Sequence, residues 1–122
     1  MWLILSTLPH YLSIVPLIGS AVPIEYTHII VMSSTLSILY HLTHESDRLI
    51  RFLDHVAALV WFGYDVYLGN RMIIDANIIS FMIHCMVPMR YYEQYHGIWH
   101  LINAAKCYYV SASLRDIYNL KK

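Results

Sequence analysis

The sequence predicts an all-α protein, an integral membrane bundle of about five transmembrane helices. Of its 122 residues, 58% are hydrophobic and only 13% are charged, which is more apolar than a soluble domain of this size can cover with polar surface. The apolar residues also form five runs of roughly the length, about 20 residues, that a helix needs to cross a bilayer. We therefore expect one multi-pass membrane domain comprising residues 1–122.

Short segments of turn-forming residues separate the five runs. The first run contains Pro9 and Pro16, which kink a membrane helix but are tolerated where neighbouring helices satisfy the freed carbonyl groups. Because all connections are short, successive helices should run antiparallel in one bundle. The expected helices are residues 2–20, 24–44, 49–68, 71–89 and 96–118, and the expected turns are residues 19–23, 44–48, 69–70 and 88–95.

The charge balance restricts the class of partner. Eight Lys and Arg residues match eight Asp and Glu residues, so the formal net charge is +0 and no basic footprint for nucleic acid is visible. Membrane lipids are the expected partners, and nucleic acid is not. The charges are spread too evenly over the turns to fix the orientation in the membrane, and both a monomer and a homo-oligomer are compatible with the sequence.

Polar side chains interrupt the apolar runs at particular places. Ser37 and His41 are four residues apart near the end of the second run, and Asp54 follows early in the third. His96 and His100, again four apart, open the fifth run. An ionisable group inside a membrane normally faces the bundle interior and a partner. Since these three helix ends meet on one side of an antiparallel bundle, we expect the five side chains to share one layer.

These residue types favour a metal site. Two histidines separated by about 6 Å of helix rise can turn both rings onto one ion, and His41 supplies a third nitrogen. Three histidines leave the fourth position of a tetrahedral Zn²⁺ ion open for water, which is the arrangement of catalytic sites. Asp54 would then accept a proton from that water, and Ser37 would hydrogen-bond the water or the substrate carbonyl.

The motifs "SILYH", "FLDH" and "HGIWH" also resemble a known group of membrane proteins. They are similar to the superfamily that joins alkaline ceramidases, the adiponectin and progestin receptors, bacterial hemolysin III proteins and the transmembrane protein 8 group, over residues 34–61 and 92–105. The resemblance implies a zinc-dependent lipid amide or ester hydrolase with His41, His96 and His100 as ligands and Ser37 and Asp54 beside them. Known members have seven membrane helices, so this chain resembles a shortened form.

Two other functions fit the same residues. A bis-histidine haem protein would clamp iron between His41 or His55 and His96 or His100. A non-enzymatic membrane protein would use a metal only to hold the helices of the bundle together. Each motif alone is weak, because histidines four apart are more often hydrogen-bonded or interfacial than ligands, and Asp54 could pair with Arg51. The histidines expected to be structural or interfacial are His10, His28, His44, His55 and His84, with His55 the nearest to the site because it adjoins Asp54.

Overall fold

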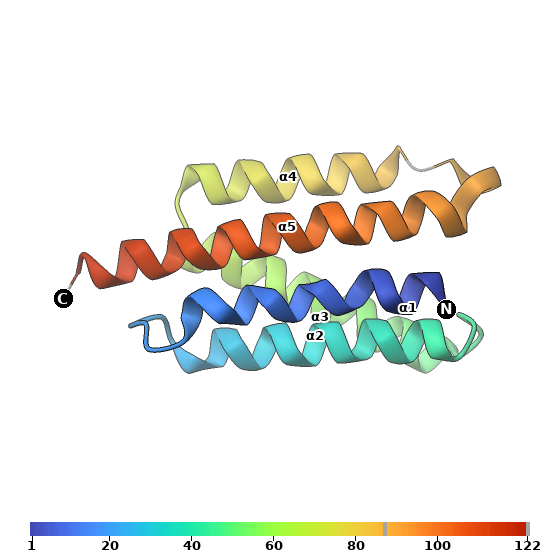
Figure 1. Ribbon diagram of the computed structural model, residues 1–122, viewed down its shortest axis with the longest axis horizontal. Coiled ribbons are helices and arrows are strands. Elements are labelled where there is room, and N and C mark those ends of the chain that lie inside the picture. The colour runs from blue at the N-terminus through green and yellow to red at the C-terminus, as the bar shows by residue number, and fades with distance from the viewer. Residues whose placement is uncertain (87, 122) are drawn as a thin grey trace.

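The structure is a computed structural model that describes residues 1–86 and 88–121, and these residues form helices and no strand. Successive helices run antiparallel, with the two ends of the chain at opposite ends of the bundle (Figure 1). The all-α prediction is therefore confirmed. In chain order the elements are α1 (Trp2–Thr7), the 3-10 helix η1 (Leu8–Leu17), α2 (Ile24–Leu42), α3 (Arg48–Leu68), α4 (Arg71–Cys85), the 3-10 turn η2 (Met89–Tyr91) and α5 (Tyr92–Asn119).

Helices α3 and α4 begin at side-chain caps. The Asp47 carboxylate accepts hydrogen bonds from the backbone N–H groups of Leu49 and Ile50, at 2.8 and 2.9 Å. The Asn70 side chain accepts one from the N–H of Ile73 at 3.2 Å. Such caps satisfy N–H groups that have no partner within the first turn of a helix. They explain why the two connections expected at residues 44–48 and 69–70 are short turns.

Three predicted boundaries are wrong. Residues 2–20 are not one α-helix, because α1 ends at Thr7 and the proline-containing stretch continues as η1 only to Leu17. Helix α4 ends at Cys85, before the predicted end at residue 89. Pro88 follows soon after and has no backbone N–H to continue the helical hydrogen bonds. Val87 lies outside the residues that the structure describes. Residues 88–95 are not one turn, since α5 already begins at Tyr92. The polar side chains in this segment are exposed to solvent, and exposed polar residues occur in helices as well as in turns.

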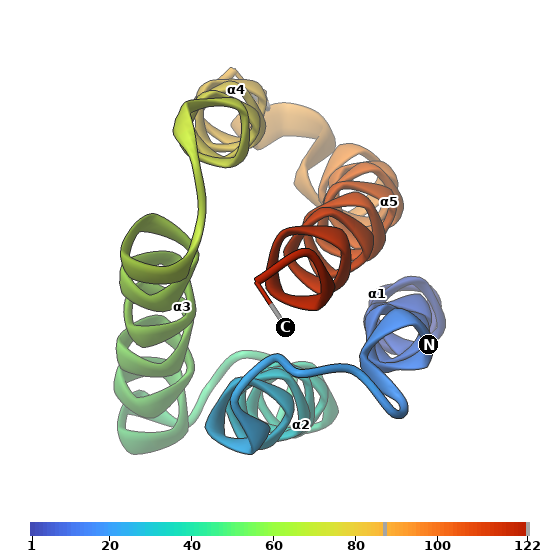
Figure 2. The ribbon, with the colours of Figure 1, turned by 90° about the vertical axis from the view of Figure 1, so that its left-hand side faces the viewer.

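Helix α5 lies between the N-terminal helices and α4. It packs against α1 and η1 on one side and against α4 on another, whereas α2 packs against α3 and η1 (Figure 2). The apolar core gathers where α2 begins and α5 ends, around the fully buried side chains of Tyr26, Ile30, Ile73, Val110 and Leu114. The opposite end of the bundle, where α2 ends and α5 begins, is therefore free to hold polar side chains.

The surface of the bundle is rich in large apolar side chains. Among the residues that the structure describes, no helix combines the length and the hydropathy that crossing a membrane requires. On α3 the exposed apolar side chains include Phe52, Leu53, Leu59, Phe62 and Val66.

Candidate metal centre

The three histidines expected to bind a metal lie together at one end of the bundle. His41 is in the last turn of α2, and His96 and His100 project from one face near the start of α5. Each offers a ring nitrogen that lies within 4.8 Å of the nitrogens offered by the other two. Their exposed fractions are only 5%, 7% and 4%. This cluster, His41, His96 and His100, could hold a metal ion.

The spacing of the His41 and His100 ring nitrogens is close to that of two ligands on one ion. The Nε2 atoms of His41 and His100 are 3.0 Å apart, and the two rings are almost perpendicular, at 87°. Two histidine ligands of a tetrahedral zinc, each at about 2.0–2.1 Å, would have nitrogens about 3.3–3.4 Å apart. Movements of a few tenths of an ångström would therefore convert this pair into ligands. The same separation also fits a hydrogen bond between two neutral rings.

Burial and one carboxylate prepare the rings for binding. Enclosure among apolar helices disfavours a charged imidazolium, so these rings are held in the neutral form that binds metals. The Nδ1 atom of His41 lies 3.0 Å from a carboxylate oxygen of Glu45. With the proton on Nδ1, this nitrogen donates to Glu45 and the lone pair of Nε2 faces the cluster. The Nδ1 atoms of His96 and His100, in contrast, are buried without a hydrogen-bond partner.

Aromatic side chains enclose the histidine pair of α5. The Tyr92 ring stacks on His96, with ring centroids 4.6 Å apart and an angle of 19°. The ring of His84, from α4, packs against that of Trp99, with centroids 4.4 Å apart, and its centroid lies 5.5 Å from that of His96. On the α1 side, a Cβ atom at Gly97 would overlap the Trp2 indole, so glycine allows this close approach. The two histidine side chains are therefore largely buried, with exposed fractions of 7% and 4%.

Ser37 and Asp54 lie outside this cluster. Ser37 is half-buried on α2, and its side chain is close enough to the Asp54 carboxylate on α3 to favour the charged form of that carboxylate. Asp54, 17% exposed at its side chain, is also close enough to Glu45 for the two charges to interact. Because Glu45 contacts His41, the Ser37–Asp54 pair is linked to the histidine cluster through one intervening carboxylate. Neither residue belongs to the group of three potential ligands.

The other histidines divide into two groups. His55 is outside the cluster, because its side chain is 67% exposed and its Nδ1 donates to the Arg51 carbonyl at 2.7 Å. His28 and His44 are also exposed. His10 and His84, in contrast, adjoin the cluster, which the sequence analysis did not foresee.

His10 is held in place at the back of the cluster. Its ring is 5.7 Å from that of His100, its Nδ1 donates to the Thr7 carbonyl at 2.9 Å, and its Nε2 accepts from the Asn103 amide at 3.0 Å. Both ring nitrogens are therefore satisfied, which makes His10 a packing partner and leaves three histidines for an ion. The signal that could have found it is its position after Pro9, inside the stretch that packs on α5.

A second buried polar cluster lies deeper in the bundle. The Asp65 carboxylate, 1% exposed, accepts a hydrogen bond from the Tyr26 hydroxyl at 2.5 Å and lies 3.9 Å from the Lys106 ammonium. Lys106 also donates to the Asn77 side-chain oxygen at 2.9 Å, and Trp61 donates to the Tyr26 hydroxyl at 3.2 Å. Each charge is paired, as burial requires. The sequence alone does not indicate this pairing, because 41 positions separate Asp65 from Lys106 in the chain.

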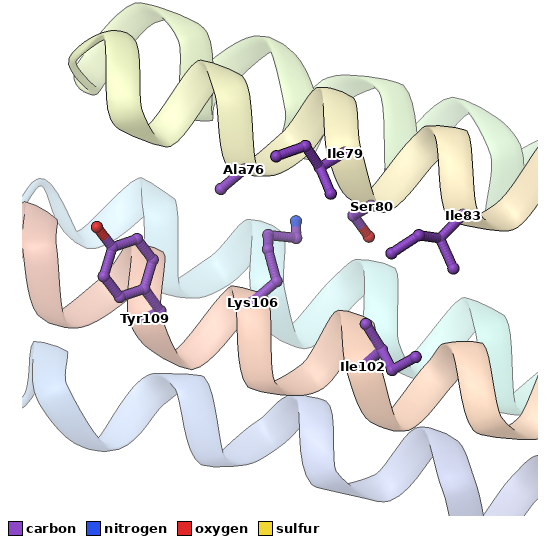
Figure 3. Close-up of a pocket in the computed structure, with 7 residues that line it drawn as sticks. All are labelled: Ala76, Ile79, Ser80, Ile83, Ile102, Lys106 and Tyr109. Carbon is purple, nitrogen blue, oxygen red and sulfur yellow. The ribbon is translucent and has the colours of Figure 1, made fainter.

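A groove of about 280 Å³ runs between α4 and α5 (Figure 3). Ile83, which lines the groove, directly precedes His84 in the sequence, and the His84 ring packs on those of His96 and Trp99. The Lys106 side chain reaches into the groove from α5, and its charge is already paired with Asp65. The lining residues are Ala76, Ile79, Ser80, Ile83, Ile102, Lys106 and Tyr109.

Comparisons with protein-family models, with curated proteins and with solved structures give no match for this chain. The resemblance to the ceramidase and adiponectin receptor superfamily therefore rests on the short motifs around Ser37, His41, Asp54, His96 and His100.

Proposed function

We propose that this protein is a zinc-dependent hydrolase that cleaves an amide or ester bond of a membrane lipid. The observation that carries the proposal is the convergence of three buried histidine nitrogens within 4.8 Å of one another. Three histidine ligands leave one position of a tetrahedral ion open, which is typical of catalytic zinc and not of structural zinc. The shortened ceramidase-like pattern of motifs points to the same chemistry.

The residues around the cluster supply the remaining roles. When bound, zinc provides a water that ionises near neutral pH and a Lewis acid for the scissile carbonyl. Asp54 is the carboxylate that would accept a proton from such a water and return it to the leaving amine or alcohol. The Ser37 side chain, which favours the charged form of Asp54, would help to orient that carboxylate. The products are a fatty acid and an amine or alcohol.

Two features support a lipid as substrate. The bundle exposes many large apolar side chains, among them Phe52, Leu59 and Phe62 on α3, which suits contact with membrane lipid. The groove between α4 and α5 lies between the two helices that carry His84 and His96, and its lining is mostly aliphatic. We assign this groove to the acyl chain of the substrate.

The spacing of the rings favours zinc over haem. Two axial histidines bind iron from opposite faces, so their nitrogens would be about 4 Å apart with a flat macrocycle between them. The Nε2 atoms of His41 and His100 are 3.0 Å apart with perpendicular rings, and His96 is a third potential ligand. This geometry leaves no space for a porphyrin between the pair.

Purified protein in detergent, loaded with zinc, tests the proposal. Fluorescent ceramides and phospholipids would be supplied to the wild type and to Asp54→Asn. Asparagine can still hydrogen-bond a water but cannot accept its proton, so we expect Asp54→Asn to keep its zinc and lose most turnover, by about 100-fold or more.

An exposed histidine on α2 gives a matched control. His28→Ala should retain both zinc and turnover, because this side chain is exposed near the start of α2, away from the cluster at the other end of that helix. Equal turnover in the wild type and in Asp54→Asn would contradict the assigned mechanism. No turnover of any lipid at full zinc occupancy would favour a non-enzymatic protein whose metal staples the bundle.

A further inference from the structure

We propose that Glu45 is a positioning residue that fixes the tautomer and the orientation of His41 for metal binding. This inference rests on the proposed metal site. The carboxylate of Glu45 lies 3.0 Å from the Nδ1 of His41, on the side of the ring away from His100. Histidine ligands commonly donate their second ring N–H to a carboxylate in this way, which orients the ring and strengthens the ligand.

The backbone after α2 has two successive residues with positive φ, and the motif that ends the helix requires only one of them. The helix ends in a Schellman motif, in which the N–H of Glu45 bonds the Tyr40 carbonyl and the N–H of His44 bonds the His41 carbonyl, both at 3.1 Å. That motif needs a positive φ at one residue, His44, where φ is 50°. Glu45 follows with a second positive φ, 60°, without being glycine. The positive φ of Glu45 therefore needs an explanation other than the Schellman motif.

The position of the Glu45 side chain supplies that cause. Glu45 lies beyond the last residue of α2, Leu42, so helical geometry does not bring residue 45 over residue 41. The turn with two positive φ angles folds the chain back, and the carboxylate then reaches the last helical turn. A strained backbone that persists in a folded protein is a reason to look for a function at that place. Here the strained residue contacts a candidate ligand directly.

Glu45 also lies near the second helix that carries candidate ligands. Tyr92 on α5 is close enough to the Glu45 carboxylate for the two groups to interact, and the Tyr92 ring stacks on His96. His96 and His100 have no partner at their buried Nδ1 atoms. Among the three candidate ligands, His41 is therefore the one whose second nitrogen is held by a carboxylate. Without Glu45, none of the three candidate histidine ligands would have a carboxylate partner at its second ring nitrogen.

Zinc affinity measured by competition with a chelating dye tests the inference on the full chain in detergent. We expect Glu45→Ala to weaken zinc binding by about 10–100-fold. Glu45→Gln keeps an oxygen that can accept the Nδ1 proton, so it should recover most of this loss. Glu93→Ala removes another exposed carboxylate near the start of α5 and should leave the affinity unchanged.

A second variant and a spectrum separate positioning from folding. Glu45→Gly removes the side chain and relieves the positive φ, so the metal-free protein should be at least as stable as the wild type while its zinc affinity falls like that of Glu45→Ala. The ligand-field spectrum of bound Co²⁺ should change in Glu45→Ala and return in Glu45→Gln. Wild-type affinity and spectrum in Glu45→Ala and Glu45→Gly would overturn the inference and leave the metal site intact. A wild type that binds neither metal would overturn both.

Discussion

The Nε2 atoms of His41 and His100 lie 3.0 Å apart, although 59 residues separate them in the chain. The contact joins the last turn of α2 to the third turn of α5, two helices whose main packing partners are other elements. A metal at this point would tie one end of the bundle together. The opposite end is held by the apolar core around Tyr26 and Leu114.

Metal binding should therefore stabilise the fold. At a free zinc concentration about 1,000 times the dissociation constant, the free energy of unfolding rises by about 4 kcal/mol, because the folded state holds the ion and the unfolded chain does not. Addition of a chelator to the wild type should lower the melting temperature by several degrees, as followed by circular dichroism. The melting temperature of His100→Ala should not respond to the chelator.

The chelator experiment has a histidine control from the same helix as His41. His28 is exposed near the start of α2, so His28→Ala should behave as the wild type. A chelator effect of equal size in the wild type and His100→Ala would mean that the ion binds elsewhere.

The buried pair of Asp65 and Lys106 should contribute to stability independently of the metal. Asp65→Ala leaves the ammonium of Lys106, whose side chain is 14% exposed, without its counter-charge, and should lower the free energy of unfolding by about 3–5 kcal/mol. Replacing both residues by leucine should recover most of this loss. Denaturant unfolding in detergent measures the change, and the zinc content should be the same in all variants.

An exposed ion pair provides the comparison for Asp65. Asp75 is 57% exposed at its side chain and lies 3.9 Å from Arg71, so Asp75→Ala should change the free energy of unfolding by less than about 1 kcal/mol. Similar losses in Asp65→Ala and Asp75→Ala would argue against a buried, mutually compensated pair.

The positive φ of His44 predicts a stabilising substitution. His44 is exposed, and its φ of 50° is costly for a residue with a Cβ atom. His44→Gly should therefore raise the free energy of unfolding by about 1 kcal/mol. The same replacement at His28, inside α2, should lower it by about 1 kcal/mol. Destabilisation of equal size at both positions would show that the His44 side chain makes a contribution of its own.

Filling the groove between α4 and α5 should affect lipid substrates according to chain length. Ala76 lines the groove, so Ala76→Phe should raise the KM for long-chain ceramides several-fold and leave short-chain analogues little changed. Ala58→Phe places the same side chain on the exposed face of α3 and should have no effect. Equal changes for long and short chains would place the acyl chain outside this groove.

The sequence predicted the helices better than their ends. Strong apolar runs located all five α-helices, but Pro9 and Pro16 converted much of the first into η1, and polar residues concealed the early start of α5. These differences arise because proline removes a backbone donor, whereas exposed polar side chains remain compatible with helix.

The candidate site was predictable where the spacing of residues along a helix determines which side chains share a face. Helical periodicity placed His96 and His100 on one face, and antiparallel order brought His41 to the same end. Glu45 could not be found in this way, because its contact with His41 depends on two positive φ angles in a turn. The approach of His10 and His84 to the cluster likewise depends on the packing of η1 and α4 against α5, which periodicity does not specify.

The zinc content of the purified chain tests the central claim most directly. Elemental analysis after removal of loosely bound metal should give one zinc per chain for the wild type. It should give none for His41→Ala, His96→Ala and His100→Ala, because each lacks one of the three converging nitrogens. Ser37→Ala should retain the zinc. A wild type without stoichiometric metal, or three histidine variants that each still carry one zinc per chain, would contradict the account.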